Sequence, residues 1–139
     1  MEYHRLKDGF LVRLDKDEEI IESIRKISVL ENIKTASVQG IGALSFVEIG
    51  RYLLNERKFV KKELKGDFEV VSLSGNITLL HENKVNIHLH IALADENFNL
   101  FGGHLVVGIV SATMEIFIHP QDKIIKRKYN NQNGLNIIE

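Results

Sequence analysis

The sequence predicts an α+β fold, an antiparallel β-sandwich or partly open barrel of about seven strands with one early amphipathic helix packed on it. Three observations lead to this prediction. From residue 34 onward, segments with alternating apolar residues follow one another, separated by turn residues. One segment near the start repeats its apolar residues at helical spacing instead. The 139 residues are 44% hydrophobic and 27% charged, which is typical of one globular domain spanning residues 1–139.

The first strand and the helix are expected within the first 30 residues. Residues 8–14 (DGFLVRL) predict a strand that begins after the turn dipeptide Asp8-Gly9. Asp15 is the expected N-cap, with Glu18 three positions later as in a capping box. A helix over residues 17–30 follows, because isoleucines recur there on one face: Ile20, Ile21, Ile24 and Ile27.

The segment ASVQGIGAL is rich in small residues and is followed by an expected strand at 45–53. Gly40, Gly42 and Ala43 do not form a nucleotide-binding motif. A dinucleotide fingerprint needs GxGxxG at the start of a helix, and a P-loop needs Gly-Lys followed by Ser or Thr. Close backbone packing or a β-bulge explains the glycines better.

Turn residues divide the rest of the chain into further strands. Residues 56–65 read as a short edge strand protected by lysines, and Gly66-Asp67 as a turn. A long strand over 68–80 is expected to bend at Gly75-Asn76. The segment after His104 predicts one long strand, or two broken near Gly108, that ends at Pro120, and the tail offers one more strand.

Residues 85–106 contain three of the six histidines in one expected β-hairpin. Apolar and polar residues alternate strictly from Val85 to Leu93, so His88 and His90 lie on the same, non-apolar face of a strand. Their Cα atoms are then about 6.5 to 7 Å apart, which allows the two imidazoles to share one ion.

The position of the turn decides where His104 lies. A turn centred on Asn97 pairs His104 with His90, and one centred on Glu96 pairs it with His88. A turn centred between residues sends His104 to the opposite face, unless Gly102-Gly103 supplies a bulge that shifts the pairing by one.

Three histidines that meet at one point predict a metal site. Three neutral imidazoles and an open position for water are the ligands of a catalytic zinc site, and another divalent transition metal could take the same place. We therefore assign His88, His90 and His104 as metal ligands. The competing interpretation is that HxH is an ordinary histidine pair on a solvated strand, and HxH alone is a weak signal.

Composition restricts the function classes. The net charge of −1 gives no general attraction to nucleic acid or to an anionic membrane, so DNA contact would need a local basic patch such as residues 57–65 or 123–128. The chain has no cysteine and therefore neither a disulfide nor a thiol nucleophile. No apolar run approaches 20 residues and no secretion signal is present, so a cytoplasmic protein without membrane contact is expected.

The motifs also resemble a known family. The early strand and helix, ASVQGIGAL, FEVVSLSGNI (68–77), HLH (88–90) and GGHL (102–105) together resemble the plant-and-prokaryote-conserved (PPC) domain over nearly the whole chain. The resemblance implies a compact α+β homotrimer and a metal, usually zinc, on the three histidines. Plant members bind DNA through an AT-hook of the RGRP type that precedes the domain, and this sequence has no RGRP segment.

Two functions from different classes follow, beside a third interpretation in which the domain is a purely structural trimer whose histidines are satisfied by hydrogen bonds. The first is a metal-binding homo-oligomeric module with a regulatory or DNA-associated role. The alternative is a small metal-dependent hydrolase that uses a metal-bound water. The sequence supplies no clear general base for it: Asp95 and Glu96 lie at the expected turn, and Glu48, Glu69 and Glu115 would need the fold to bring them near.

Overall fold

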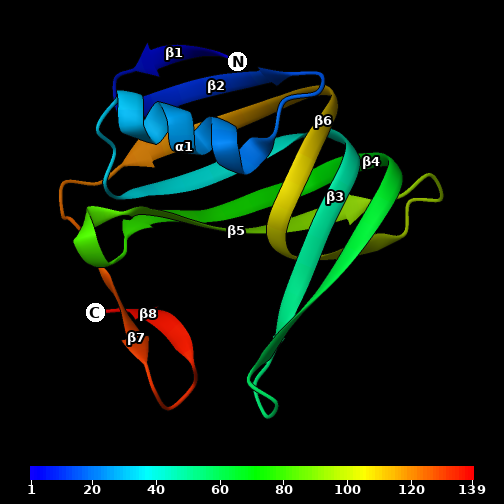
Figure 1. The fold of residues 1–139 in the computed structure, drawn as a ribbon. Helices are drawn as coiled ribbons and strands as arrows, with labels where there is room; N and C mark the ends of the chain where they lie inside the picture. Colours follow the sequence, from blue (N-terminus) through cyan, green and yellow to red (C-terminus); the bar gives the residue numbers. More distant parts are fainter.

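The computed structural model describes residues 1–139 as eight strands, one α-helix and one 3-10 turn (Figure 1). The α+β class is confirmed, and antiparallel strands make up most of the chain. In chain order the elements are β1 (Glu2–Leu6), β2 (Gly9–Asp15), α1 (Ile20–Leu30), β3 (Ala36–Leu53), β4 (Lys58–Leu79), η1 (His81–Asn83), β5 (Val85–Ala94), β6 (Leu100–Pro120), β7 (Arg127–Asn130) and β8 (Leu135–Ile138).

Six strands form one antiparallel sheet in the order β1-β2-β6-β3-β4-β5. The start of β6 pairs in addition with β5, so β3, β4, β5 and β6 are joined in a closed circuit of pairings. The sheet is strongly bent without clearly forming a barrel. This bend brings the first residues of β6 beside the histidines of β5.

The helix begins later than the sequence predicted. Its N-cap is Glu19, whose side chain accepts a hydrogen bond from the Glu22 backbone N–H at 2.6 Å. The expected contact between Asp15 and Glu18 exists, with the Asp15 N–H donating to Glu18 at 2.8 Å, but it stabilises the loop before the helix. Asp17 has a φ of 69°, which is not helical. No helix of the protein has the length and apolar character to cross a membrane.

Several expected breaks lie inside continuous strands. β3 runs through Gly40 and Gly42 with register shifts there and at Leu44/Phe46, which agrees with the expected bulges. The turn expected at Gly66-Asp67 is wrong, because β4 continues through both residues and bonds to β3 on either side of them. β4 also continues through Gly75, and β6 through Gly108.

One apolar core lies between α1 and the sheet. Ile20, Ile24 and Ile27 of the helix are fully buried. They belong to a cluster of 23 buried hydrophobic residues, whose other members come from β2 to β6 and from Ile33. No buried residue lies beyond Ile118, so the core is complete before the last two strands.

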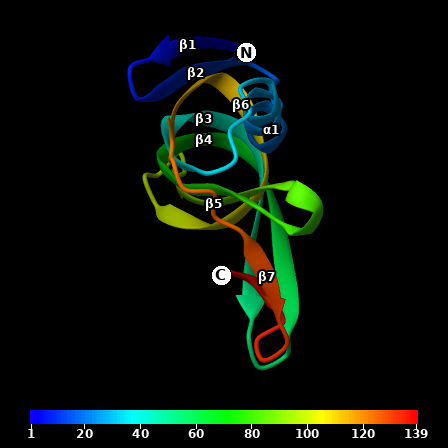
Figure 2. The same ribbon diagram turned by 90° about the vertical axis from the view of Figure 1, so that its left-hand side faces the viewer.

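The chain ends in a separate hairpin of β7 and β8, where one further strand was expected. Figure 1 shows this hairpin and the joined ends of β3 and β4 projecting from the body in the same direction, and Figure 2 shows them overlapping from the side. The Tyr52 hydroxyl donates to the Asn133 carbonyl at 2.9 Å and the Arg57 guanidinium to the Gln132 carbonyl at 3.0 Å. These bonds hold the C-terminal hairpin against the body.

Candidate metal centre

The hairpin of β5 and β6 brings the three predicted histidines together. His90 pairs directly with His104, which is the register of a turn centred on Asn97. The Asp95 carboxylate stabilises this turn by accepting hydrogen bonds from the backbone N–H groups of Asn97 and Asn99, both at 2.9 Å. Since His88 precedes His90 by two residues on β5, its side chain lies on the same face.

The three imidazoles are close enough to hold one metal ion. One ring nitrogen from each histidine lies within 4.8 Å of the other two. The ring centroids are 5.0 to 5.5 Å apart. Zinc–nitrogen bonds of about 2.0 to 2.1 Å in a tetrahedron put the nitrogens about 3.3 Å apart. The side chains would have to rotate to reach this spacing, and three imidazole nitrogens are a donor set that suits zinc.

Burial favours the neutral form of two of the three histidines. Burial lowers the pKa of His88 from 6.5 to about 4, and the neighbouring His104, Arg127 and His90 add to the shift. Burial, followed by the charge of His90, also lowers the pKa of His104. A metal binds the neutral form of imidazole, so these environments favour the ligating state at neutral pH.

Arg127 of β7 is the nearest charged neighbour of the histidines. One of its Nη atoms lies 3.4 Å from His88 Nδ1 and 3.0 Å from Asn76 Oδ1. Its Nε donates to the Thr78 hydroxyl at 2.9 Å, and its other Nη donates to the Asn136 carbonyl at 2.9 Å. Every one of these partners is neutral in charge, and burial lowers the pKa of the guanidinium.

Two glycines allow the strands to pack closely around the histidines. A Cβ at Gly75 would clash with the backbone carbonyl of His88 on the neighbouring strand. A Cβ at Gly50 would clash with the ring of Phe59, which packs edge-on against His104 with centroids 5.5 Å apart. Glycine is therefore required at Gly75, where the clash is with backbone, whereas a side chain at Gly50 would displace the Phe59 ring from its place beside His104.

A cavity of about 580 Å³ opens beside the histidines. Its wall includes the three imidazoles, Arg127, Phe59 and apolar residues of β8. It contains no carboxylate, so none of the acids considered as a general base, Asp95, Glu96, Glu48, Glu69 and Glu115, lies in its wall. Glu48 instead forms an ion pair with Lys61 at 2.7 Å, and Glu115 is exposed.

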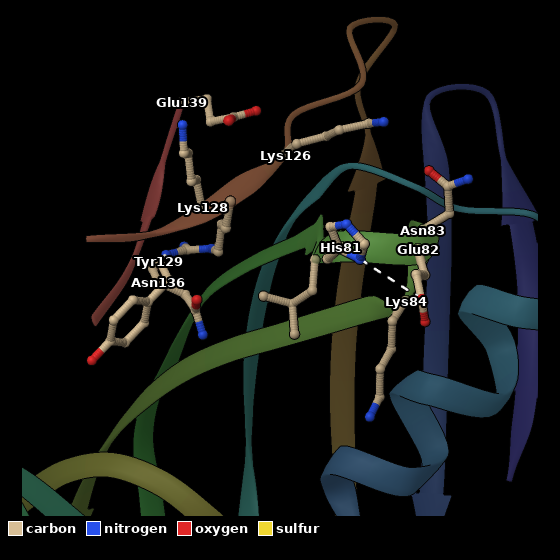
Figure 3. Close-up of a pocket in the computed structure, with 11 residues that line it drawn as sticks. His81, Glu82, Asn83, Lys84, Lys126, Lys128, Tyr129, Asn136 and Glu139 are labelled. Carbon is tan, nitrogen blue, oxygen red and sulfur yellow. Dashed lines mark hydrogen bonds and ion pairs between the residues drawn. The ribbon is translucent and has the colours of Figure 1, made fainter. Parts of the chain in front are cut away.

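A second, larger cavity of about 830 Å³ lies between the 3-10 turn and the C-terminal hairpin (Figure 3). It is lined by basic residues, among them Lys84, Lys126 and Lys128. Figure 3 shows that their ammonium groups point in different directions and do not converge. The His81 side chain is 95% exposed at this edge. The histidine cavity is therefore the better candidate for a specific site.

The sequence did not identify Arg127 or Phe59 as neighbours of the site. Arg127 was grouped with the surrounding lysines as a basic cluster, and it reaches His88 only because the chain returns to β4 after β6: Leu79 N–H donates to the Ile125 carbonyl at 3.0 Å. The only feature of the sequence that distinguishes Arg127 is that it is the one arginine in a cluster of lysines. Phe59 is brought to His104 by the pairing of β3 with both β4 and β6.

Comparisons with solved structures find close relatives of this fold. A PPC protein from Pyrococcus horikoshii is 34% identical, with a TM-score of 0.87 and coverage of 99% of this chain and 93% of the other. A metal-containing protein from Archaeoglobus fulgidus is 31% identical, with a TM-score of 0.85 and coverage of 98% and 95%. A protein from Bacteroides thetaiotaomicron described as a "putative DNA binding protein" is 25% identical, with a TM-score of 0.96 and coverage of 99% and 96%.

No curated protein matches the chain in sequence. A family model does match: the Plants and Prokaryotes Conserved (PCC) domain covers residues 1–121, which includes every strand of the main sheet, the helix and the three histidines. This is the family that the HLH and GGHL motifs resemble. The chain belongs to the Plants and Prokaryotes Conserved domain family.

Proposed function

We propose that this chain is a metal-binding module that holds zinc, or another divalent transition metal, on His88, His90 and His104. The observation that carries the proposal is the convergence of three imidazole nitrogens within 4.8 Å on one rigid hairpin. The lowered pKa values of His88 and His104 support it, because neutral imidazoles need not lose a proton to bind. The 31% identical relative described as a metal-containing protein supports it as well.

The test is the metal content of protein purified without a histidine tag. We expect about one equivalent of zinc per chain, since three histidines complete a single site. The double variant His88→Ala/His104→Ala should lose it. The matched control is His4→Ala/His81→Ala, which removes the same number of histidines from exposed positions and should keep the metal. Wild-type protein that holds no zinc after zinc has been supplied and the excess removed would refute the proposal.

A metal-dependent hydrolase is the second candidate, and the cavity beside the histidines favours it. A metal with three histidine ligands keeps an open position, where bound water has a pKa of about 7. The absence of a carboxylate from the cavity wall argues for the binding role as the first choice. Hydrolysis of a chromogenic ester by the zinc-loaded protein tests the alternative. Turnover that is unchanged in His104→Ala would rule out this site as its source.

We further propose that the module assembles as a homo-oligomer, a trimer by resemblance, with a regulatory or DNA-associated role. The "putative DNA binding protein" relative supports the DNA association, and local basic residues such as Lys62 and Lys126 would carry it. Binding to phosphates weakens steeply as salt rises, so affinity for duplex DNA measured at several salt concentrations is the test. Absent or salt-independent binding would refute it. Sedimentation with and without a chelator would show whether assembly needs the metal.

A further inference from the structure

The cavity beside the histidines has an unbalanced positive charge. Arg51 and Arg127 are its only charged residues apart from the histidines, and no carboxylate lies in its wall. Arg127 is half-buried and all of its partners are neutral: a hydroxyl, an amide oxygen, a backbone carbonyl and an imidazole. Buried cations in proteins are usually paired with an anion. Here the protein supplies none.

The cavity also has an apolar side. Phe59, Leu135 and Ile137 line it and remain 38 to 39% exposed. A site that combines one fixed cation with exposed apolar side chains suits a small organic anion better than inorganic phosphate. Nucleic acid needs several phosphate contacts, and no lysine lies in the wall of this cavity.

The tautomer of His88 links this site to the metal. A guanidinium can only donate, so its contact with His88 Nδ1 requires that nitrogen to accept. When His88 binds a metal through Nε2, its Nδ1 carries the hydrogen and no longer accepts from Arg127. Arg127 has five N–H groups and four of them donate to the partners above, so one is free for another acceptor without the metal and a second becomes free with it.

We infer that this cavity binds a small aliphatic carboxylate, with the carboxylate on Arg127 and the open metal position and its hydrocarbon part against Phe59 and β8. The inference deepens the proposed metal site and rests on it for the second contact of the carboxylate. The contact with Arg127 does not depend on the metal. Arg127 is a binding residue in this scheme, and the histidines hold the metal.

The experiment is a calorimetric or NMR titration of zinc-loaded and metal-free protein with isovalerate. Isovaleramide, which has the same shape without charge, and inorganic phosphate are the comparison probes. We expect isovalerate to bind at least about tenfold more tightly than isovaleramide, because a charge-assisted hydrogen bond is lost with the amide. Phosphate binding as tight as that of isovalerate would overturn the assignment of an aliphatic carboxylate.

Arg127→Gln tests the named residue, and Lys128→Gln is the matched control on the next residue of β7, which does not line this cavity. Arg127→Gln should weaken isovalerate binding by about tenfold or more, and Lys128→Gln by less than about twofold. Arg127→Lys, which keeps the charge and loses the planar fork, should give an intermediate value. Circular dichroism and zinc content establish that each variant is folded and loaded. Equal isovalerate affinity in the wild type and a folded Arg127→Gln would overturn the inference.

The two proposals fail in different ways. If the protein binds no zinc, but metal-free protein binds isovalerate and Arg127→Gln weakens that binding, the metal function fails and the carboxylate site stands. If zinc binds and isovalerate does not, the carboxylate site fails and the metal function stands. The zinc affinity of Arg127→Gln tests separately whether the charge of Arg127 acts on the metal site. Removing a cation beside His88 should tighten zinc binding by about three- to tenfold.

Discussion

At the scale of single residues, the site depends on environments that differ among chemically identical side chains. His88 and His104 lie half-buried between strands, and His90 is exposed at the edge of the same group. His88 alone contacts Arg127. The histidine group thus has an exposed side, at His90, and a partly buried side, where burial lowers the pKa of His88 and His104.

The first prediction at this scale concerns pH. In the unfolded chain His88 should titrate near its usual pKa of 6.5, and in the folded protein near 4. Between these values the unfolded state binds a proton that the folded state does not, so the free energy of unfolding falls as pH falls through this window. His104 contributes in the same direction. Urea unfolding of metal-free protein at pH 7 and pH 5 measures the loss.

His88→Gln is the control for this pH effect. Glutamine is neutral and of similar length, so residue 88 no longer titrates. The free energy of unfolding of this variant should therefore fall less between pH 7 and pH 5 than that of the wild type. Identical losses in the two proteins would show that His88 does not have the depressed pKa.

The second prediction concerns Gly75. Gly75→Ala places a methyl group against the His88 carbonyl, and two paired backbones have little room to separate, so the free energy of unfolding should fall by about 1 to 3 kcal/mol. The control Ser74→Ala, at the exposed neighbouring residue, should change the free energy of unfolding by less than about 0.5 kcal/mol. Thermal unfolding of both variants makes the comparison, and a neutral Gly75→Ala would contradict the close packing described above.

The histidine residues of the site could be named from the sequence, but their surroundings could not. The placement of the histidines follows from local properties of the sequence: the alternation along residues 85–93, and the symmetry of positions 90 and 104 about Asn97. The structure pairs His90 with His104, as this symmetry predicts. Arg127 lies 39 residues from His88 in the chain, and no local pattern determines which neighbour a long-range return brings to a strand. The convergence of the three histidines was therefore predictable, and the charge beside them was not.

At the scale of elements, the long strands contain turn-like residues that a reading of the sequence takes as strand ends. Gly66-Asp67 has the composition of a turn, yet β4 passes through it because β3 offers a bonding partner on both sides. β1 was missed, since Glu2–Leu6 is mostly exposed and lacks an apolar face. The helix was found from its isoleucines, but its start was placed too early because Asp15 and Glu18 have the spacing of a capping box, whereas the actual N-cap is Glu19.

The third prediction belongs to the helix. Ile24 is fully buried in α1, so Ile24→Ala leaves a cavity in the core and should lower the free energy of unfolding by about 2 to 5 kcal/mol. Val29 on the same helix is 69% exposed. Val29→Ala should be neutral within about 0.5 kcal/mol. Chemical denaturation of the pair tests this, and equal effects would mean that α1 does not pack on the sheet as described.

At the scale of the whole molecule, the protein divides into a core-bearing body and a C-terminal hairpin that adds no buried residue. The body contains all three histidines and Phe59, and the hairpin supplies Arg127, Leu135 and Ile137 to the cavity. The strand and helix content of the body was foreseeable from alternation and periodicity. The arrangement of the hairpin was not, because it rests on a few polar contacts without an apolar pattern.

The fourth prediction follows from this division. A chain that stops after Ile125 keeps the main-sheet strands, the helix and the bond from Leu79 to Ile125. We expect it to unfold cooperatively, with lower stability than the full chain, because it loses the bonds of Tyr52, Arg57 and Arg127. Zinc binding should persist and isovalerate binding should be lost. A truncated chain without native circular dichroism would show that the body needs the hairpin.

The central position of β6 has a consequence for how the chain acquires its structure. β6 bonds to β2, β3 and β5, and Val12 pairs with Ile116 from opposite ends of the body. Such distant pairings require large loops to close, which slows folding. During synthesis the helix and the earlier strands must wait, with their apolar faces exposed, until residues near 118 leave the ribosome. The three histidines are all present as soon as His104 emerges, so under the proposed metal function a bound ion would hold the β5–β6 hairpin in register before the rest of the sheet closes.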